Sequence, residues 1–571
     1  MDRNKLLGAL VKDEKRFKSS AQQALAPYGP QKGYFTEQEL CGVINDMAKL
    51  FQLPKDIKKQ MAADFAGAGN VSMTESLNLY HGWIYFLHDT FDTRKAVSRR
   101  ANFVGQFEVT EERLKELYVF KKRLGSGSFG EVWLVADRFT GAARVCKQVY
   151  ISKDDHFRKE NKKNLTPMLV FQKEVNALKA LDHPHVLKVY DVMRNATCST
   201  AWLITEWCEG DTLGSRVKQL YAESMLLKEG YVARVIFQIL RALAYVKDYG
   251  FVHKDLKPDN IMYVGNNSDS DVKIIDFGLV ETMERCRLSA SGTLMFMAPE
   301  VLSKKYNHTC DTWAVGCIMY HMLTGRFAFS GPTKDIKQNI LNHPYDLRNL
   351  DHVSSHARHL LKLLLDKDGV TRPGAAVTMR HPWFKHMGLT GAPLPELTQL
   401  VKENLLGVAE MSQLKILLMN LMAHHLSAND KQVHQLHLLF SAVNRNFNGE
   451  ISQAEFCQWL TAGGVADDVA TRVFSGLDIR AGGRLSLTEF LAGTFEFARE
   501  HLAGLKGAFN RMDFDNDNGI NLDEFNLLLS GGREAGGRLS QYFCRLGGTE
   551  DGLLRWSDLE SYLTGKEGIF R

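Results

Sequence analysis

The sequence predicts a multidomain α+β protein, in which a segment of short strands precedes a much longer helical part. Three observations lead to this class. At 571 residues the chain is too long for one hydrophobic core. The segment from Tyr118 to Val149 alternates apolar and polar residues around glycines, which is typical of strands joined by tight turns. From about Phe171 to Phe384, apolar residues recur instead at the three- and four-residue spacing of amphipathic helices.

The composition is that of an ordinary soluble globular protein. Hydrophobic residues make up 44% of the chain and charged residues 24%. The net charge of +5 gives no indication of nucleic-acid binding. Nine cysteines without a CxxC pair indicate reduced thiols, so we expect a cytoplasmic protein. The sequence has no apolar run of transmembrane length, no signal peptide and no myristoylation glycine at position 2, so we expect no transmembrane segment.

A domain boundary is predicted near residue 390, where GLTGAPLPEL combines two glycines with two prolines. After it, apolar residues from Leu397 to Leu421 recur every three or four positions. This pattern predicts one long amphipathic helix.

A repeat follows this helix. Four twelve-residue windows begin at Asn444, Asp478, Asp513 and Gly547, and their starts lie 34, 35 and 34 residues apart. Each window has glycine or asparagine near its sixth position, an aliphatic residue at its eighth and an acid at its twelfth. The spacing suits helix–loop–helix units packed as two pairs.

Two N-terminal windows fit the same template less well. The windows 28–39 and 64–75 place Gly33 and Gly69 sixth, Phe35 and Val71 eighth, and glutamates twelfth. Neither window keeps an acid at the third or fifth position of the template. The region is therefore either a third, degenerate pair or an unrelated helical extension.

Six short motifs succeed one another between residues 125 and 300. They are GSGSFGEV at 125–132, Lys147 in the strand-like RVCKQV, Glu174 at the start of EVNALKAL, HKDLKPDN at 253–260, DFG at 276–278 and APE at 298–300. A glycine-rich string alone also fits a plain hairpin, but coincidence of all six in order is negligible. The series resembles the protein-kinase signature, and the resemblance covers residues 117–384. It implies a bilobal kinase fold with a β-rich N-terminal lobe and an α-rich C-terminal lobe.

The kinase resemblance implies sites for ATP and Mg²⁺. It assigns catalysis to Asp255, which accepts the substrate's hydroxyl proton, to Lys257, which steadies the phosphate, and to Lys147, which binds the ATP phosphates. Asn260 and Asp276 are the implied Mg²⁺ ligands. The implied nucleotide-binding residues are Leu124, Gly125, Ser126, Gly127, Ser128, Phe129, Gly130, Val132, Val145, Lys147, Glu174, Thr205, Glu206 and Cys208.

The phosphate acceptor is predicted to be serine or threonine. Lys257, within DLKPDN, and Thr293, within GTLMFMAPE, occupy positions where tyrosine kinases carry other residues. An acid at Asp211 favours protein substrates with basic residues before the target hydroxyl. The resemblance also assigns structural roles to Asp311 and to an Arg372–Glu300 pair.

Two residues depart from the kinase pattern. Lys254 replaces the usual arginine of HRD, and lysine cannot make the same forked contact with a phosphate. Activation by a phosphorylated loop is therefore less expected, although Ser289 and Ser291 are candidates for modification. Val145 replaces the usual alanine and should tighten the adenine pocket.

The window DFDNDNGINLDE, at 513–524, matches a calcium-binding EF-hand loop. Calcium takes six to eight oxygen ligands, and the loop places oxygens at the required steps. The predicted ligands are Asp513, Asp515, Asp517, the Gly519 carbonyl, Asn521 through water and Glu524. Asn518 stands where glycine is usual and tolerates the left-handed conformation needed there.

The other three C-terminal windows are weaker. A low-affinity calcium site is predicted at 444–455, with oxygens from Asn444, Asn446, Asn448, Glu450 and Glu455. The window 478–489 has Arg480 and Gly482 at ligand positions and is predicted to be free of metal. The window 547–558 keeps Asp551 and Asp558 but begins with Gly547 and has Thr549 third, so we expect it only to brace its partner loop.

A kinase segment, a long helix and two EF pairs in this order resemble the calcium-dependent protein kinases of plants and protists. The resemblance implies that the junction helix, residues about 394–426, blocks the kinase until calcium rearranges the EF module. The alternative is that this helix only packs. The predicted segments are a tail at 1–25, a possible degenerate EF pair at 26–92, a linker at 93–116, the kinase domain at 117–384, the junction at 385–426, and EF pairs at 427–495 and 496–571.

The predicted function is therefore that of a calcium-regulated serine/threonine kinase using ATP, Mg²⁺ and Ca²⁺, with protein substrates and no nucleic-acid partner. Two alternatives remain open at this point. In one, the EF module is structural and the kinase ignores calcium. In the other, the chain is a calcium-binding pseudokinase scaffold, which the presence of Lys147, Asp255 and Asp276 disfavours.

Overall fold

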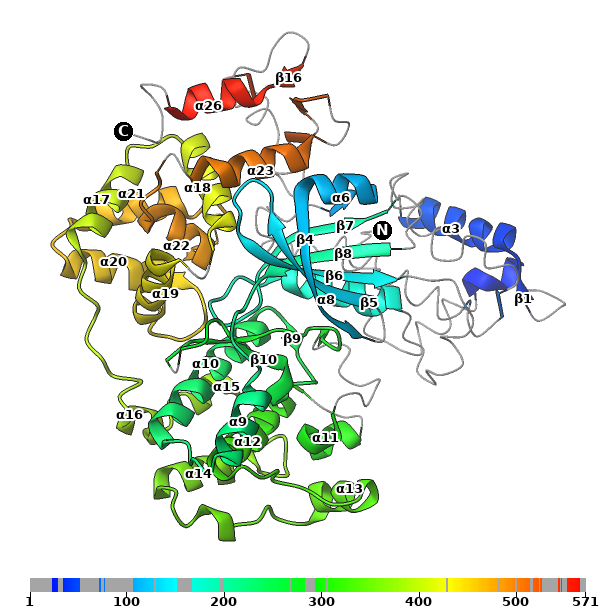
Figure 1. The fold of residues 1–571 in the computed structure, drawn as a ribbon, viewed down its shortest axis with the longest axis vertical. Helices are drawn as coiled ribbons and strands as arrows, with labels where there is room; N and C mark the ends of the chain where they lie inside the picture. The colour runs from blue at the N-terminus through cyan, green and yellow to red at the C-terminus, as the bar shows by residue number, and fades with distance from the viewer. Residues whose placement is uncertain are drawn as a thin grey trace. The chain divides into compact units, whose positions relative to one another are not determined.

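The protein is described by a computed structural model that divides into two units, Met1–Arg99 and Arg100–Arg571 (Figure 1). Each unit is described by itself. The structure describes all residues except 1–22, 29–33, 52–70, 73–75, 77–105, 128–129, 151–166, 196–199, 268, 283–292, 304–306, 428–429, 481, 499–500, 514–516, 523, 526–542, 545, 547–551 and 565–571.

The N-terminal unit contains a short antiparallel ladder beside a helix. Strand β1 (Tyr34–Phe35) pairs with β2 (Val71–Ser72), and Phe35 lies opposite Val71. Helix α3 (Glu37–Phe51) follows β1, and η1 (Ala26–Tyr28) precedes it. At the start of α3, the Glu39 carboxylate accepts hydrogen bonds from the Thr36 backbone N–H (2.7 Å) and hydroxyl (2.8 Å). The other sequence markers of this region, Gly33, Gly69 and Glu75, lie outside the described residues.

The N-terminal lobe is a six-stranded sheet in the order β3-β7-β8-β6-β5-β4. Its strands are β3 (Gln106–Glu108), β4 (Tyr118–Gly127), β5 (Gly130–Asp137), β6 (Ala143–Tyr150), β7 (Val189–Arg194) and β8 (Thr200–Glu206). The strands expected within 118–149 are confirmed as β4, β5 and β6. The segment 93–116, expected as a linker, instead contributes β3, which pairs in parallel with β7, and helix α6 (Glu111–Leu117).

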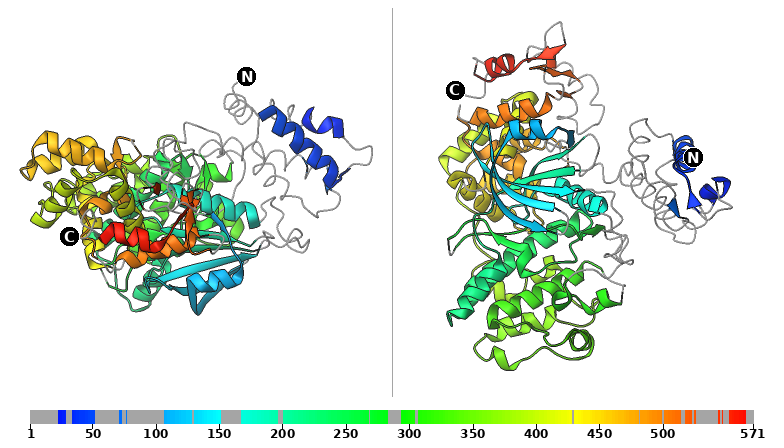
Figure 2. Two further views of the ribbon diagram at one scale, coloured as in Figure 1. Left: turned by 90° about the horizontal axis from the view of Figure 1, so that it is seen from above. Right: turned by 45° about the vertical axis from the view of Figure 1, so that its right-hand side comes forward.

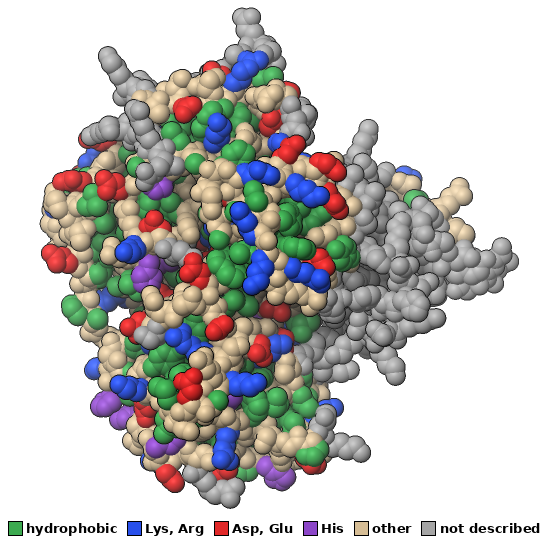
Figure 3. Space-filling model, viewed as in Figure 1, with side chains coloured by type: hydrophobic (Ala, Val, Ile, Leu, Met, Phe, Trp, Pro, Cys, Tyr) green, Lys and Arg blue, Asp and Glu red, His purple; other side chains and the backbone are tan. Residues whose placement is uncertain are grey.

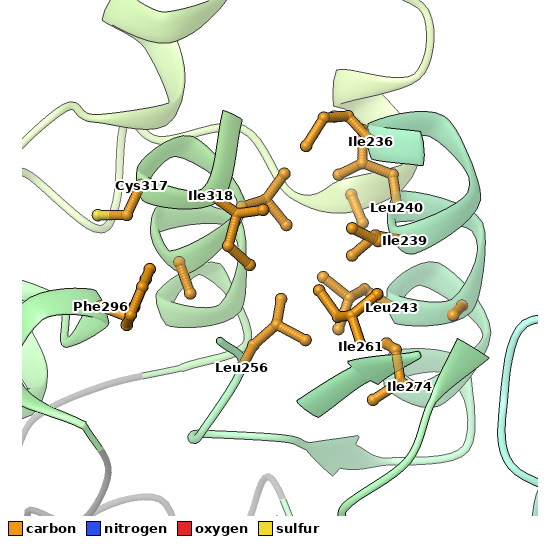
Figure 4. Close-up of a cluster of buried hydrophobic side chains, with 14 of the residues drawn as sticks. Ile236, Ile239, Leu240, Leu243, Leu256, Ile261, Ile274, Phe296, Cys317 and Ile318 are labelled. Carbon is orange, nitrogen blue, oxygen red and sulfur yellow. The ribbon is translucent and has the colours of Figure 1, made fainter. Parts of the chain in front are cut away.

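The C-terminal lobe is built around two buried helices, α10 (Glu229–Asp248) and α12 (Thr309–Thr324). Figure 4 shows their facing side chains meeting, with residues from β10 (Ile261–Tyr263) and β11 (Val272–Ile274) closing the core. Helix α12 is buried on all sides, so its apolar residues form no single stripe. Other helices of this lobe are α9 (Leu213–Ala222), α11 (Pro299–Leu302), α13 (Thr333–Asn342), α14 (Ser355–Leu364), α15 (Ala375–Thr378) and α16 (Pro382–His386). Helix α8 (Pro167–Ala180), between β6 and β7 in the chain, contacts these two strands of the N-terminal lobe.

The junction segment forms two helices, so the expectation of one long helix is wrong. Helix α17 (Gln399–Val408) ends at Ala409, and α18 (Gln413–His425) begins after Ser412. The Ser412 hydroxyl accepts from the Lys415 backbone N–H, which makes Ser412 the N-cap of a new helix. Eleven residues of α18 are buried, because neighbours surround it. Apolar spacing cannot distinguish such a helix from a continuation of α17.

Two pairs of helix–loop–helix units complete a C-terminal module, defined here as α17 to α26. The first pair contains α19 (Lys431–Val443), β13 (Ile451–Ser452), α20 (Gln453–Ala462), α21 (Asp467–Leu477), β14 (Arg484–Leu485) and α22 (Leu487–Thr494). The second contains α23 (Leu502–Met512), β15 (Ile520–Asn521), β16 (Leu553–Leu554) and α26 (Trp556–Thr564). Ile451 lies opposite Leu485, and Ile520 opposite Leu554. These are the eighth positions of the four sequence windows, so the repeat has a direct structural counterpart.

The C-terminal module packs against the N-terminal lobe, and Figure 2 shows α18 and α23 beside the sheet. At the end of α18, the Arg144 guanidinium donates to the His425 carbonyl (3.1 Å), and the Tyr190 hydroxyl donates to the Leu426 carbonyl (3.1 Å). Acidic and basic side chains are interspersed on the face shown in Figure 3, in keeping with the small net charge. No helix among the described residues is both long and apolar enough to cross a bilayer.

Buried histidines at this contact predict that acid weakens the folded state. Burial lowers the pKa of His183 and His425 well below the usual range, and that of His185 to about 4. Below a pH of about 6.5 the unfolded chain binds protons that the folded chain excludes, so stability present at pH 7 is lost as the pH falls. We expect the melting temperature to fall between pH 7 and pH 5, with a shallower slope in His425→Gln. The exposed-histidine variant His386→Gln should keep the wild-type slope; equal slopes in the two variants would contradict this reading.

Candidate functional site

The kinase motifs place an ion pair between the sheet and the first helix of the kinase segment. Lys147 on β6 lies opposite Val132 on β5, and its ammonium is 2.6 Å from the Glu174 carboxylate on α8. Burial alone would lower the pKa of Lys147, but the carboxylates of Glu174 and Asp276 outweigh it and raise that pKa. Lys147 therefore stays charged, as an anchor for phosphates requires.

A second group of polar side chains surrounds Asp255. Its carboxylate accepts from the Thr293 backbone N–H (2.8 Å) and hydroxyl (3.1 Å). The Lys257 ammonium lies 2.9 Å from Asp255 and donates to the Thr293 hydroxyl at 3.2 Å. These bonds orient the carboxylate, as a group that accepts a proton in the reaction requires.

The hydrophobic core positions this group. Leu256, Ile261 and Ile274 point into the hydrophobic core (Figure 4). Each is a near neighbour in sequence of a candidate site residue, Asp255, Asn260 or Asp276. Burial of the apolar side chains therefore fixes where the polar ones emerge.

Asp311 stabilises the turn that precedes Asp255. Its buried carboxylate accepts from the backbone N–H groups of His253 (2.8 Å) and Lys254 (2.9 Å). These bonds hold Lys254 at a φ of 73°, which is unusual for a non-glycine residue. The other expected brace is present too, with Arg372 Nη2 3.0 Å from Glu300.

Asn260 and Asp276, the expected Mg²⁺ ligands, each have an oxygen that could bind a metal ion. The Asn260 side-chain nitrogen donates to the Asp255 carbonyl at 2.8 Å, so its oxygen is the atom that could bind a metal. Asp276 accepts from the Gly278 N–H at 2.9 Å and lies close enough to Lys147 to raise its pKa. An amide oxygen and a carboxylate fit Mg²⁺, a hard cation that prefers oxygen.

The predicted nucleotide pocket is partly described. Val145 lies opposite Thr205 across the β6–β8 pairing, and Leu124, Gly125 and Ser126 lie along β4. A Cβ at Gly130 would lie 1.8 Å from the Gln148 carbonyl oxygen, so only glycine fits there. Gly127 closes the β4–β5 pairing opposite Gly130, while Ser128 and Phe129 lie outside the described residues.

The hinge residues have other partners than ATP. The Glu206 carboxylate accepts from the Lys188 N–H at 2.6 Å and pairs with the buried Lys273 ammonium at 2.9 Å. The Cys208 thiol is buried, and burial raises its pKa. The Glu206 side chain is therefore bonded within the protein, and its backbone N–H donates to the Lys188 carbonyl at 3.0 Å.

The strongest calcium window has donors that suit the ion. Asp513 is buried, burial raises its pKa, and its oxygens accept from the N–H groups of Asp517 (3.0 Å) and Asn518 (3.1 Å). The Glu524 carboxylate accepts from the Asn521 N–H at 2.9 Å, and Asn518 has the left-handed φ of 65°. Asp515 lies outside the described residues, and no three His, Cys, Asp or Glu side chains among the described ones are already gathered as metal ligands. The fit to calcium therefore rests on donor chemistry: carboxylates at positions one, three, five and twelve of a twelve-residue loop.

In the window 444–455, the side chains expected to bind calcium form hydrogen bonds within the loop. The Asn444 side-chain nitrogen donates to the side-chain oxygens of Asn446 (3.2 Å) and Asn448 (3.0 Å) and to the Glu450 carbonyl. Glu455 accepts from the N–H groups of Arg445 and Asn446. The oxygens expected to bind calcium weakly are thus turned toward nitrogens.

The remaining two windows are described in part. In 478–489, the Arg480 guanidinium pairs with Glu489, so the carboxylate at the twelfth position already has a cationic partner. In 547–558, Asp558 accepts from the Arg555 N–H at 3.2 Å, and Gly547, Thr549 and Asp551 lie outside the described residues.

One buried cluster was not anticipated from the sequence. Arg511, at the end of α23, forms ion pairs with Asp137 and Asp191 of the N-terminal lobe, and the Tyr118 hydroxyl donates to Asp191. Its members lie up to about 400 residues apart, so no local pattern links them. The one available signal was a charged residue on the buried face of a helix, two residues before the calcium window.

Comparisons with known proteins agree with this geometry. Residues 118–384 match the protein kinase domain family. Calcium-dependent protein kinase 6 of Plasmodium berghei (strain Anka) is 35% identical over 415 residues, which are 72% of this chain and 26% of that protein. This chain thus spans about a quarter of the length of that relative.

Other relatives are matched over more of their length. Calcium-dependent protein kinase 5 of Plasmodium falciparum (isolate 3D7) is 29% identical over 74% of this chain and 72% of its own. Calcium-dependent protein kinase 9 of Oryza sativa subsp. japonica is 29% identical over 68% and 66%. The matches extend well beyond the kinase domain, so the chain is similar to calcium-dependent protein kinases over about 70% of its length.

Proposed function

We propose that this chain is a calcium-regulated serine/threonine protein kinase that transfers the γ-phosphate of ATP to protein substrates. The observation that carries the proposal is the simultaneous presence of the Lys147–Glu174 ion pair and the Asp255–Lys257–Thr293 network. Both must be in place for phosphoryl transfer, which depends on positioning and charge neutralisation.

The residues of the site divide this work. Lys147, held by Glu174, binds the α- and β-phosphates. Lys257 neutralises charge on the transferring group, and Asp255 accepts the proton of the attacking hydroxyl. Mg²⁺ held by Asn260 and Asp276 would supply further positive charge at the phosphates.

Calcium control is assigned to the loop 513–524, because it combines acidic ligands at the first, third, fifth and twelfth positions with a direct connection to the kinase. Helix α23 runs directly into Asp513 and carries Arg511 into the N-terminal lobe. Arg113, beside the sheet, donates to the Asn510 carbonyl (2.7 Å) and the Asp513 carbonyl (3.3 Å). A change in the loop would therefore reach the lobe that holds Lys147. We further propose that the junction helices restrain the kinase when this loop is empty.

Two finer assignments belong to the same proposal. Substrates would carry basic residues before the target hydroxyl, because Asp211 is exposed at the start of α9. A reducing, cytoplasmic location would suit the seven described cysteines, all of which are free thiols.

The N-terminal unit is proposed to be a third, degenerate EF pair. Phe35 and Val71, the eighth positions of its windows, lie opposite each other as in the C-terminal pairs. The Thr36–Glu39 bonds match the capping boxes Ser452–Glu455 and Ser486–Glu489 at the same loop positions. Because its windows lack acids at the third and fifth positions, we expect it to bind no calcium.

The experiment measures phosphorylation of a serine peptide by the full chain in chelator and in micromolar calcium. We expect a several-fold rise with calcium in the wild type and its loss in Glu524→Gln, which removes the bidentate ligand. The matched control Glu560→Gln changes an exposed glutamate on α26 and should keep the response. A wild-type rate indifferent to chelator would refute calcium control, and a rate no greater than that of Asp276→Ala would refute the kinase.

A further inference from the structure

We propose that the first pair of the C-terminal module has exchanged calcium for nitrogen atoms of its own side chains, and that its two loops bind the C-terminal lobe of the kinase without metal. The proposal deepens the proposed function, because it leaves the second pair as the calcium-responsive part of the module.

Arg480 stands at the third position of the loop 478–489, where EF-hand loops carry a calcium ligand. Its Nη2 is 2.9 Å from Glu489, its Nε donates to the other Glu489 oxygen at 3.1 Å, and its Nη2 donates to the Arg484 carbonyl at 3.3 Å. The twelfth-position carboxylate and the seventh-position carbonyl are two of the groups that bind calcium in an EF-hand. The guanidinium therefore satisfies ligands that would otherwise need a metal cation.

Burial reinforces this pairing. Only 9% of the Arg480 side chain and 5% of the Glu489 side chain is exposed, so neither charge is solvated by water. Burial alone would lower the pKa of Arg480, but Glu489, Tyr249 and Glu450 raise it. The cation is thus permanent, unlike a bound metal ion.

In the loop 444–455, the neutral side-chain amide of Asn444 satisfies oxygens that would otherwise bind calcium. Its side-chain nitrogen faces the oxygens at positions three, five and seven, while its side-chain oxygen accepts from the Gly449 N–H at 3.2 Å. The last bond fixes which end of the amide is nitrogen, because a backbone N–H can only donate. Three oxygens that would converge on calcium converge on this nitrogen.

Both closed loops lie against the kinase. The Tyr249 hydroxyl, just beyond α10, donates to Glu450 at 2.8 Å, and Glu450 also pairs with Arg480 at 3.1 Å. Phe447 adopts a φ of 59° and packs edge-on against Phe237 of α10, with ring centroids 5.3 Å apart. Asp182 accepts from the Thr488 N–H at 2.9 Å.

Close approach at Gly449 supports the same contact. A Cβ there would lie 2.4 Å from the Tyr245 ring on α10. The contacts of the loop 444–455 are thus made by its fourth, sixth and seventh residues, Phe447, Gly449 and Glu450. Arg480 links the two loops of the pair to each other and to Tyr249.

The test measures hydrogen exchange of residues 238–250 and 478–489 in the full chain, in chelator. Every protein carries Glu524→Gln, so the second pair cannot contribute through calcium. Arg480→Met should raise exchange in both segments by on the order of 10²-fold, because Glu489 and Glu450 lose their buried partner. Arg484→Met removes a half-exposed arginine 3.9 Å from Glu450 and should leave exchange near the starting value.

A second variant tests the position of the cation. Arg480→Asp places a carboxylate where a calcium-binding loop has one, so its raised exchange should fall when millimolar calcium is added. Equal exchange in Arg480→Met and Arg484→Met would overturn the proposal, as would an Arg480→Asp variant indifferent to calcium. Neither readout involves kinase activity, so the result stands whether or not the wild-type enzyme responds to calcium.

Discussion

Replacing Asp255 by asparagine is expected to lower kcat by about 10²–10⁴-fold, with little change in nucleotide affinity. Asparagine keeps the size of the side chain and can still accept from Thr293, but it cannot take the proton of the attacking hydroxyl. It also removes the negative charge 2.9 Å from the Lys257 ammonium. Steady-state phosphorylation of a serine peptide, with ATP affinity measured separately, separates the two effects.

The matched control is Asp269→Asn, which changes an aspartate whose side chain is 92% exposed in the same lobe. It should retain the wild-type kcat. Equal thermal midpoints for the two variants would show that neither has lost the fold. A kcat for Asp255→Asn within tenfold of the wild type would contradict the role assigned to this carboxylate.

Replacing Arg511 by methionine is expected to cost about 3–5 kcal/mol of stability at the contact between the C-terminal module and the N-terminal lobe. Only 3% of the Arg511 side chain is exposed, and its partners Asp137 and Asp191 are 3% and 2% exposed. Removing the cation leaves two carboxylates buried together without a counter-charge. The loss should lower the midpoint temperature of the first thermal unfolding transition. It should also reduce the rise in kinase activity that calcium produces.

Arg472→Met provides the control, because Arg472 is 64% exposed and its pair with Asp468 is on the surface. Such pairs contribute about 0–1 kcal/mol. Adding Asp137→Asn and Asp191→Asn to the Arg511 variant removes the stranded charges and should recover part of the loss. Coincident unfolding of Arg511→Met and Arg472→Met would show that the cluster does not hold the module.

The limits of prediction are visible in particular elements. The apolar spacing of 397–421 is the same on either side of Ser412, so it could not reveal that the Ser412 hydroxyl starts a new helix. The segment 106–117 becomes β3 and α6 through distant partners, because β3 pairs with β7 and α6 buries Leu114 and Leu117 against the sheet. Conversely, the eighth positions of the loop windows were correctly aligned from the sequence, since each pair of loops needs that one short ladder.

In the loops 478–489 and 444–455, the sequence identified the residues at the ligand positions but not the hydrogen bonds that these residues form. The sequence shows that 478–489 has an arginine at a ligand position, and this predicts the absence of calcium. It does not show that the arginine itself bonds to the ligands, or that Tyr249 joins them. For 444–455, five oxygens at suitable positions predicted weak calcium binding, whereas the structure turns three of them to the Asn444 nitrogen.

The sequence by itself determined the kinase motifs, their order, and the one acidic loop at 513–524, because these depend on residue types at fixed local spacings. Only the tertiary structure showed which residues connect the C-terminal module to the kinase lobes. Arg511, Asp137 and Asp191 come from distant parts of the chain, and so do Arg480, Glu450 and Tyr249. Their charges matter because folding removes them from water together, and no local pattern records which buried charge will meet which.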